Sequence, residues 1–309
     1  MPCLKYIALL GLLLGSGPFV FTQGTDCDKR MLVVNARDRQ GRFLPLQSSD
    51  FRARLGKKDA TVLSVTRQVN APRVVILLDK SGSMGTEDNT KALQFISSEL
   101  VRTMPGNPQF ALVVFAEKVL ETVEFGHARA EVLSAIDRAG KSEGQGSTAL
   151  RDALLSATNL FGTTQVGDSV VLFSDGGDNQ SKTSQRDLER SYSSKGIRAF
   201  PFIFINREFA TEEEMSSPDY LAALAAVTGG SVGIVFPQLL TMKEAPPIVR
   251  QLEDVLSRYY IVQIQLPETA RSDASLQLEP LDVSGRKRKD VKLSFPQRVA
   301  ACALPSTHQ

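Results

Sequence analysis

A short polar stretch in the first third of the chain combines side chains that could hold a metal ion. Residues 79–85 read DKSGSMG, so the Asp79 carboxylate and the Ser81 and Ser83 hydroxyls recur at alternate positions. These groups are hard oxygen ligands, which favour Mg²⁺, Mn²⁺ or Ca²⁺ over zinc or copper. The stretch therefore predicts a divalent cation site. The alternative is a polar loop in which Asp79 or Ser81 caps a helix.

The segments on either side predict how this loop is held. Residues 73–78 (RVVILL) form a short apolar run that is typical of a fully buried strand. Between residues 89 and 104, apolar residues recur at helical spacing at Leu93, Ile96 and Leu100. The loop therefore leaves the carboxyl end of a strand and enters a helix, which is where open α/β sheets bind their ligands.

Two later segments present further oxygen ligands at similar positions. Residues 146–150 (GSTAL) place the Thr148 hydroxyl ahead of a predicted helix, and residues 173–176 (FSDG) place the Asp175 carboxylate after a predicted strand. Taken alone, Thr148 could be a helix cap and Asp175 a turn residue. The three segments together resemble the metal-ion-dependent adhesion site of von Willebrand factor A (vWA) domains. The resemblance implies five metal ligands, namely Asp79, Ser81, Ser83, Thr148 and Asp175.

This resemblance implies a protein-binding function without catalysis. Two carboxylates roughly neutralise a divalent cation, and hydroxyls and water complete its shell. One water can then be replaced by an Asp or Glu carboxylate of a partner protein. Asp178 and Asn179 follow the third segment, and we place them outside the set of direct ligands.

Two other functions remain open at this point. A secreted hydrolase could use Ser81 or Ser83 as its nucleophile, but the two histidines, His127 and His308, do not follow a recognisable strand end beside a carboxylate. No Gly-x-Ser-x-Gly elbow surrounds Ser83, because position 81 is serine. A base other than histidine stays possible. In the third function the metal only stabilises the fold.

The region from 71 to 258 alternates apolar strand patterns with helical ones. This alternation predicts an α/β fold with a doubly wound, mostly parallel sheet, which is the Rossmann-like architecture of vWA domains. Residues 118–123 follow the preceding strand so closely that they predict an antiparallel edge strand. Pro201 lies within a strand pattern at 198–205, which predicts an edge or a bulge there.

Both flanks of this region have β character. Residues 25–70 and 259–299 contain alternating apolar and polar runs, but each has too few strands to be stable alone. We therefore expect them to pair into one accessory β-sandwich-like domain, followed by a tail at 300–309. A looser resemblance links these flanks to secreted vWA-related acidobacterial proteins. The basic run at 286–289 is interpreted as a solvated hairpin tip.

The amino terminus predicts export. Residues 1–24 have a lysine, an apolar stretch and small residues near Gly24, as in a cleaved signal peptide, which implies a secreted or periplasmic protein. No later segment is apolar enough to span a membrane. The net charge of +2 gives no reason to expect nucleic acid as a partner. Cys27 and Cys302 could form a disulfide in the mature chain or remain free thiols.

Overall fold

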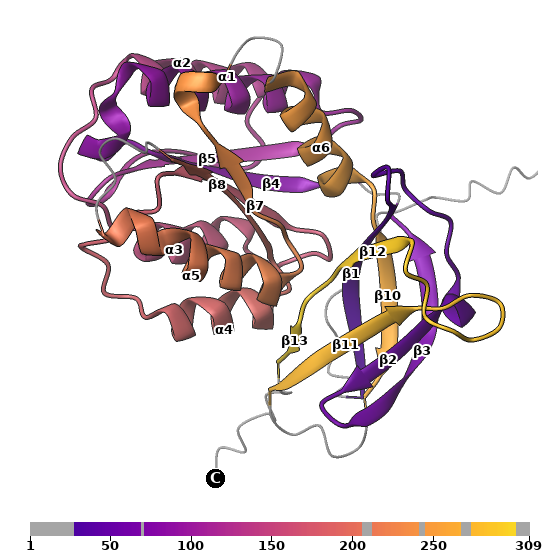
Figure 1. Cartoon of the computed structure of the whole chain (residues 1–309). Coiled ribbons are helices and arrows are strands. Elements are labelled where there is room, and N and C mark those ends of the chain that lie inside the picture. Colours follow the sequence, from indigo (N-terminus) through magenta and orange to yellow (C-terminus); the bar gives the residue numbers. More distant parts are fainter. Residues whose placement is uncertain (1–27, 69–70, 206–211, 241–244, 267–272, 301–309) are drawn as a thin grey trace, which may run out of the picture.

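The structure is a computed structural model, and it describes residues 28–68, 71–205, 212–240, 245–266 and 273–300. Within these residues the chain forms a six-stranded sheet between two layers of helices and a separate seven-stranded sheet (Figure 1). The expected signal peptide, Cys27 and Cys302 lie outside the described residues. None of the helices in the described ranges has both the length and the apolar character needed to cross a membrane.

The six-stranded sheet forms the centre of the α/β region. All its neighbouring strands are parallel except β6, which runs antiparallel to β5, as the short connection between them predicts. Most of these strands are buried along their whole length, because helices cover both faces. In sheet order the strands are β6 (Val119–Val123), β5 (Gln109–Phe115), β4 (Arg73–Asp79), β7 (Ser169–Ser174), β8 (Arg198–Phe204) and β9 (Gly233–Val235).

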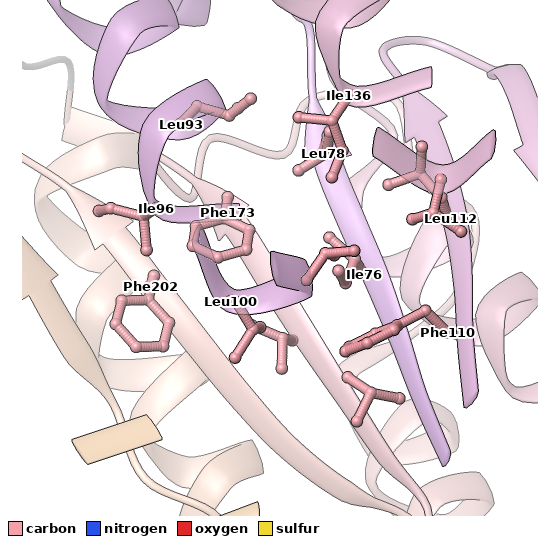
Figure 2. Close-up of a cluster of buried hydrophobic side chains, with 14 of the residues drawn as sticks. Ile76, Leu78, Leu93, Ile96, Leu100, Phe110, Leu112, Ile136, Phe173 and Phe202 are labelled. Atoms are coloured by element: carbon pink, nitrogen blue, oxygen red, sulfur yellow. The ribbon is translucent and has the colours of Figure 1, made fainter. Parts of the chain in front are cut away.

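Helices cover this sheet in two layers (Figure 1). One layer consists of α1 (Glu87–Thr103), α2 (Arg129–Lys141) and α6 (Ala245–Ser257). The other consists of α3 (Leu150–Ala157), α4 (Gln185–Lys195) and α5 (Glu212–Thr228). Figure 2 shows the first core, in which the predicted face of α1 packs on the sheet through Leu93, Ile96 and Leu100. The predicted doubly wound α/β architecture is therefore present.

The proline in β8 does not mark an edge strand. β8 pairs with β7 on one side and β9 on the other. However, β9 has only three residues, and its pairing begins opposite Phe202. Pro201 therefore lies where β8 has no neighbour on the β9 side, so the missing N–H leaves no gap in that ladder. The edge predicted from the proline is therefore limited to residues 198–201 of β8, which have no partner in β9.

The seven-stranded sheet, called the accessory sheet below, combines strands from both flanks of the α/β region. In sheet order the strands are β12 (Val291–Ser294), β1 (Lys29–Asp38), β10 (Tyr260–Gln265), β3 (Lys58–Arg67), β2 (Phe51–Leu55), β11 (Ala274–Pro280) and β13 (Arg298–Val299). The flanks thus share one β unit, as expected from their incomplete apolar faces.

This unit is one curled antiparallel sheet, whereas the sequence predicted a sandwich-like arrangement. β1 pairs with β10 along its first part and with β12 along its last part, and β3 is divided similarly between β10 and β2. Because each strand is hydrogen-bonded to the next in one continuous order, the seven strands form a single sheet instead of two stacked layers. Its concave side is filled by apolar side chains, including Leu32, Val34, Val262 and Ile264.

Candidate metal centre

The predicted ligands gather at the carboxyl edge of the central sheet. Asp79 is the last residue of β4, and Asp175 directly follows the adjacent parallel strand β7. The loop that carries Thr148 is tied to the end of β5, because the Ala149 N–H donates to the Ala116 carbonyl at 2.9 Å. The three segments therefore lie together at the carboxyl ends of the neighbouring strands β5, β4 and β7, as the strand–helix alternation predicted.

Asp79 is fully buried and fixed by hydrogen bonds. Its Oδ1 accepts a bond from the Ser81 N–H at 2.8 Å, and its Oδ2 accepts one from Ser174 Oγ at 2.5 Å. The Gly176 N–H donates in turn to Ser174 Oγ at 2.9 Å, which links Asp79 to the loop of Asp175. The role of Ser174 has no signal in the sequence, since its contact with Asp79 depends on β4 and β7 being neighbours.

The two carboxylates repel each other. Burial raises the pKa of Asp79 to about 7, and the nearby charge of Asp175 contributes further to that rise. Among the described residues, no Lys or Arg side chain forms an ion pair with Asp79 within 4.0 Å. Lys80 is buried next to it, but its ammonium group contacts Thr90 Oγ1 at 3.4 Å. A bound divalent cation would remove this repulsion.

The hydroxyl ligands differ in exposure. Ser81 is buried and Ser83 is exposed, and their Oγ atoms are 3.4 Å apart. Thr148 is buried, but its hydroxyl makes no hydrogen bond to the other four predicted ligands within the described structure. The structure thus brings Asp79 together with Asp175 and Ser81 together with Ser83, and it holds Thr148 through the backbone.

Two loops approach so closely that glycine is required. The Gly82 N–H donates to the Gly146 carbonyl at 3.1 Å, and the Gln145 N–H donates to the Lys80 carbonyl at 3.0 Å. A Cβ atom on Gly144 would lie 2.5 Å from the Gly85 Cα, which is too close for any side chain. The glycines therefore allow the first and second segments to form one rigid cradle.

The loop after β7 is attached to the start of α3. Asn179 Oδ1 accepts a hydrogen bond from the Thr148 N–H at 3.0 Å, and the Asn179 N–H donates to the Thr148 carbonyl at 3.1 Å. Asp178 accepts bonds from the Arg151 N–H at 3.2 Å and from Arg151 Nε at 2.6 Å. Asp178 and Asn179 thus position the segment that carries Thr148, and their place outside the direct ligands stays a prediction.

Replacing Asn179 by alanine should weaken metal binding about tenfold, because groups that orient a ligand usually change affinity by about ten- to a hundredfold. The variant loses the bond that fixes the Thr148 backbone, while every predicted ligand remains. Calorimetric titration with Mg²⁺ measures the change. Gln180→Ala is the matched control, because only the backbone of Gln180 contacts Thr148. Equal affinity in wild type and Asn179→Ala would show that Thr148 needs no such support.

The structure separates the predicted serines from the histidine nearest to them in sequence. His127 follows β6, whose antiparallel direction carries it to the opposite edge of the central sheet. There it is exposed and pairs with Glu131 at 2.8 Å. His308 lies outside the described residues. No described histidine therefore contacts Ser81 or Ser83.

The donor set fits a hard divalent cation. Within the described part of the chain, no group of three or more His, Cys, Asp or Glu side chains is arranged to hold a metal ion. The predicted set therefore has two carboxylates, Asp79 and Asp175. Together with the three hydroxyls they supply oxygen atoms only, the chemistry that Mg²⁺, Mn²⁺ and Ca²⁺ prefer.

Part of the α/β region matches a known protein family. Residues 74–177 match the family model described as von Willebrand factor type A domain. A zinc-occupied structure of proximal thread matrix protein 1 from the mussel byssus is 18% identical, with a TM-score of 0.50, and the alignment covers 63% of this chain and 49% of that one. At this identity the similarity concerns the fold alone. No curated protein sequence matches the chain.

Two bacterial structures show weaker overall similarity. The conserved hypothetical protein BatB from Bacteroides thetaiotaomicron is 18% identical over 60% of this chain and 98% of its own, with a TM-score of 0.47. A von Willebrand factor type A protein from Catenulispora acidiphila is 15% identical over 90% and 75%, with a TM-score of 0.48. The family match over residues 74–177 begins in β4 and ends after Asp175, and so spans the three segments described above. Residues 74–177 therefore match the von Willebrand factor type A domain family.

Proposed function

We propose that the vWA domain binds one divalent cation and, through it, an acidic side chain of a partner protein. The observation that carries the proposal is the burial of Asp79 beside Asp175, which raises the pKa of Asp79. A protein gains nothing in stability from two buried carboxylates that repel each other. Their arrangement is explained if a cation normally neutralises them.

In this proposal Asp79, Ser81, Ser83, Thr148 and Asp175 hold the cation. The cation supplies a positive centre that attracts a carboxylate. Asp79 is positioned by Ser81 and Ser174, and Thr148 is positioned by Asn179. Ser83 is the exposed member of the set, so the partner would approach from its side. The remaining ligands are buried and keep their geometry when the partner leaves.

The proposed metal is Mg²⁺, with Mn²⁺ and Ca²⁺ as alternatives, since all the donors are hard oxygen atoms. In the byssus protein named above, zinc occupies the MIDAS motif, that is, the metal-ion-dependent adhesion site. That occupancy supports a cation at this kind of site, although an all-oxygen set favours magnesium over zinc.

We further propose that the protein acts outside the cytoplasm, as a secreted or periplasmic protein whose signal peptide is residues 1–24. The proposed domains are the vWA domain at 71–258 and an accessory domain built from 25–70 and 259–299. The shared accessory sheet supports this division, because each flank supplies strands that the other needs. The likeness of the flanks to vWA-related acidobacterial proteins belongs to the same proposal.

A capture experiment with and without chelator tests the function. Immobilised protein should retain a partner from the native extracytoplasmic fraction in Mg²⁺, release it in EDTA, and recover it when Mg²⁺ is restored. Ser83→Ala should weaken capture, whereas Ser134→Ala, on the exposed face of α2, should not. Circular dichroism must show that EDTA leaves the fold intact.

The same experiment separates the alternatives. Capture that survives EDTA in folded protein would show that the partner does not bind through the metal. Unfolding of the protein in EDTA would instead assign the metal a structural role. Ester or peptide hydrolysis that Ser83→Ala abolishes, with metal retained, would instead support a hydrolase. The position of His127 and the contact of Lys80 with Thr90 both favour the binding function, because neither residue is placed to activate Ser81 or Ser83.

A further inference from the structure

Two adjoining cavities lie where the accessory sheet meets the α/β region. One has a volume of about 440 Å³ and lies between β1, β12, Phe200 and α6. The other has a volume of about 650 Å³ and lies between the turn after β1, Arg67 and the end of α6. Both are lined by Gln40 and Gly41, so they share a wall. We call the pair the junction groove. Binding sites are common at such contacts between domains.

The junction groove carries a surplus of positive charge. Among its described lining residues, six are basic and two are acidic, although the whole chain has a net charge of only +2. Both carboxylates are already paired, since Asp254 contacts Arg37 at 2.7 Å and Arg258 at 3.2 Å, and Asp38 contacts Arg42 at 2.6 Å. The six basic residues are Arg37, Arg39, Arg42, Arg67, Arg258 and Lys292.

Two stacked aromatic rings, Phe43 and Tyr260, lie among these basic residues, and we call them the aromatic wall. Phe43 stacks on Tyr260 with ring centroids 4.8 Å apart, and the guanidinium groups of Arg37 and Arg67 lie 4.9 Å and 5.3 Å from the Phe43 ring centre. The Tyr260 hydroxyl donates to the Leu44 carbonyl and accepts from the Leu46 N–H, which fixes the segment that carries Phe43. The wall is therefore formed before any ligand arrives.

We propose that the junction groove binds an acidic, aromatic-containing segment of a partner protein. Guanidinium groups match the two oxygens of a carboxylate, and a flat side chain can stack on the exposed Arg67 guanidinium, which lies over the Phe43 ring. One extended segment can place successive side chains on both sides of the Gln40–Gly41 wall, since its alternate side chains are about 7 Å apart. A bare phosphate or a sulfated sugar would supply charge but no flat side chain to stack on the Arg67 guanidinium.

This site is independent of the metal centre. The metal ligands lie at the carboxyl edge of the central sheet, whereas α6 and β1 meet near the opposite edge, where β8 begins at Arg198. A strand of seven residues such as β4 separates the edges by roughly 20 Å. A single side chain cannot reach both places.

Not every basic residue of the groove is available for a test. Arg37 is largely buried and donates to the carbonyls of Asp254 and Arg258, so it also holds the domains together. Arg39, Arg67 and Lys292 are exposed, and none of them forms an ion pair within 4.0 Å among the described residues. Replacing these three should therefore change the groove without disturbing the fold.

A peptide-display selection tests the proposal. A random dodecapeptide library is selected on wild-type protein and counter-selected on Arg39→Glu/Arg67→Glu/Lys292→Glu, with EDTA present throughout so that the metal centre cannot capture carboxylates. The control variant, Lys57→Glu/Arg286→Glu/Lys289→Glu, has the same charge change at exposed positions away from the groove. Fluorescence polarisation measures Kd, and circular dichroism confirms folding.

The selected peptides should be acidic with at least one aromatic residue. Their Kd should rise tenfold or more in the groove variant, about threefold in Arg67→Gln alone, and hardly at all in the control variant. The absence of an acidic family, or equal binding to both triple variants, would overturn the proposal. Tighter binding of a heparin oligosaccharide or inorganic phosphate than of any peptide would also overturn it and assign the groove to simple anions.

Discussion

Titration of the wild-type protein with Mg²⁺ should reveal one site per chain, and Asp79→Ala should lower its affinity at least a hundredfold. The substitution removes one of two carboxylates that would neutralise the cation, and it leaves Asp175 to carry the charge alone. Asp79 is also the proposed ligand whose carboxylate accepts hydrogen bonds from Ser81 and Ser174. Isothermal titration calorimetry in metal-free buffer measures this loss directly.

The same carboxylate makes metal binding depend on pH. The pKa of Asp79 rises from 3.8 to about 7 in the folded chain, so the metal-free fold holds this proton more tightly than the unfolded chain. Its contribution to stability is therefore complete below pH 3.8 and is lost as the pH rises to about 7. Because the cation binds the ionised form, Mg²⁺ affinity should rise roughly tenfold per pH unit from pH 5 to 7 and then level off.

The Asp79→Asn variant shows whether a loss of Mg²⁺ binding comes from the missing charge or from unfolding of the protein. The metal-free variant should be more stable than wild type at pH 8, by up to about 4 kcal/mol, because no charge is buried. It should also lose the pH-dependent Mg²⁺ affinity. Asp137→Asn, at an exposed position of α2, is the matched control and should behave as wild type. Equal Mg²⁺ binding by wild type and both Asp79 variants would refute the assignment of the metal centre.

A second large effect, on the free energy of unfolding, should follow from replacing Arg198, the first residue of β8. Its side chain is fully buried between the rings of Phe200 and Tyr259, with the guanidinium carbon 5.1 Å and 4.5 Å from their centres. Burial lowers the pKa of Arg198 to about 10, so it stays charged at neutral pH. It is one of the largest fully buried side chains in the described structure.

Arg198 connects the two halves of the molecule. It donates to the carbonyls of Val255 and Leu256 at the end of α6, at 2.9 Å and 3.3 Å, and to the Gly167 carbonyl at 3.2 Å. It also contacts Asn35 Oδ1 in β1 at 3.4 Å. A cation at the carboxyl end of a helix is favoured by the helix dipole, and here it also joins the accessory sheet to the α/β region.

Replacing Arg198 by alanine should lower the free energy of unfolding by ~3–5 kcal/mol, because several buried carbonyls lose their donor and a void opens between two rings. Urea denaturation followed by circular dichroism measures this change. Arg198→Lys should recover only part of the loss, since one ammonium group cannot replace the planar fork. Arg298→Ala, which removes an exposed arginine 3.9 Å from Glu189, should change stability by less than about 0.5 kcal/mol. A similar change in the Arg198 and Arg298 variants would contradict the role of Arg198.

The sequence alone was sufficient to predict the α/β alternation and the edge of the sheet at which the three polar segments meet. Buried parallel strands produce continuous apolar runs such as residues 73–78, and α1 shows its buried face through helical spacing. Both signals are local, so they can be read without knowing which strands are neighbours. The three segments proposed to hold the cation could be recognised for the same reason, because each one follows a strand or precedes a helix.

Contacts between distant segments were decided only by the tertiary structure. The bond from Ser174 to Asp79 exists because β4 and β7 are adjacent, and the requirement for glycine at Gly144 exists because its loop meets Gly85. Arg198 appears in the sequence as an ordinary polar start of a strand, and its burial depends on α6 and β1 closing over it.

In the accessory sheet, too, some features follow from local sequence patterns and others depend on tertiary contacts. The apolar alternation in both flanks predicted that they share a core, because neither could cover its own apolar face. Whether they form two stacked sheets or one curled sheet depends on how β1 and β3 divide their pairing between neighbours. Period-two alternation is the same in both arrangements, since it records only which side of a strand is buried. The partner that each strand residue pairs with is a property of the assembled sheet.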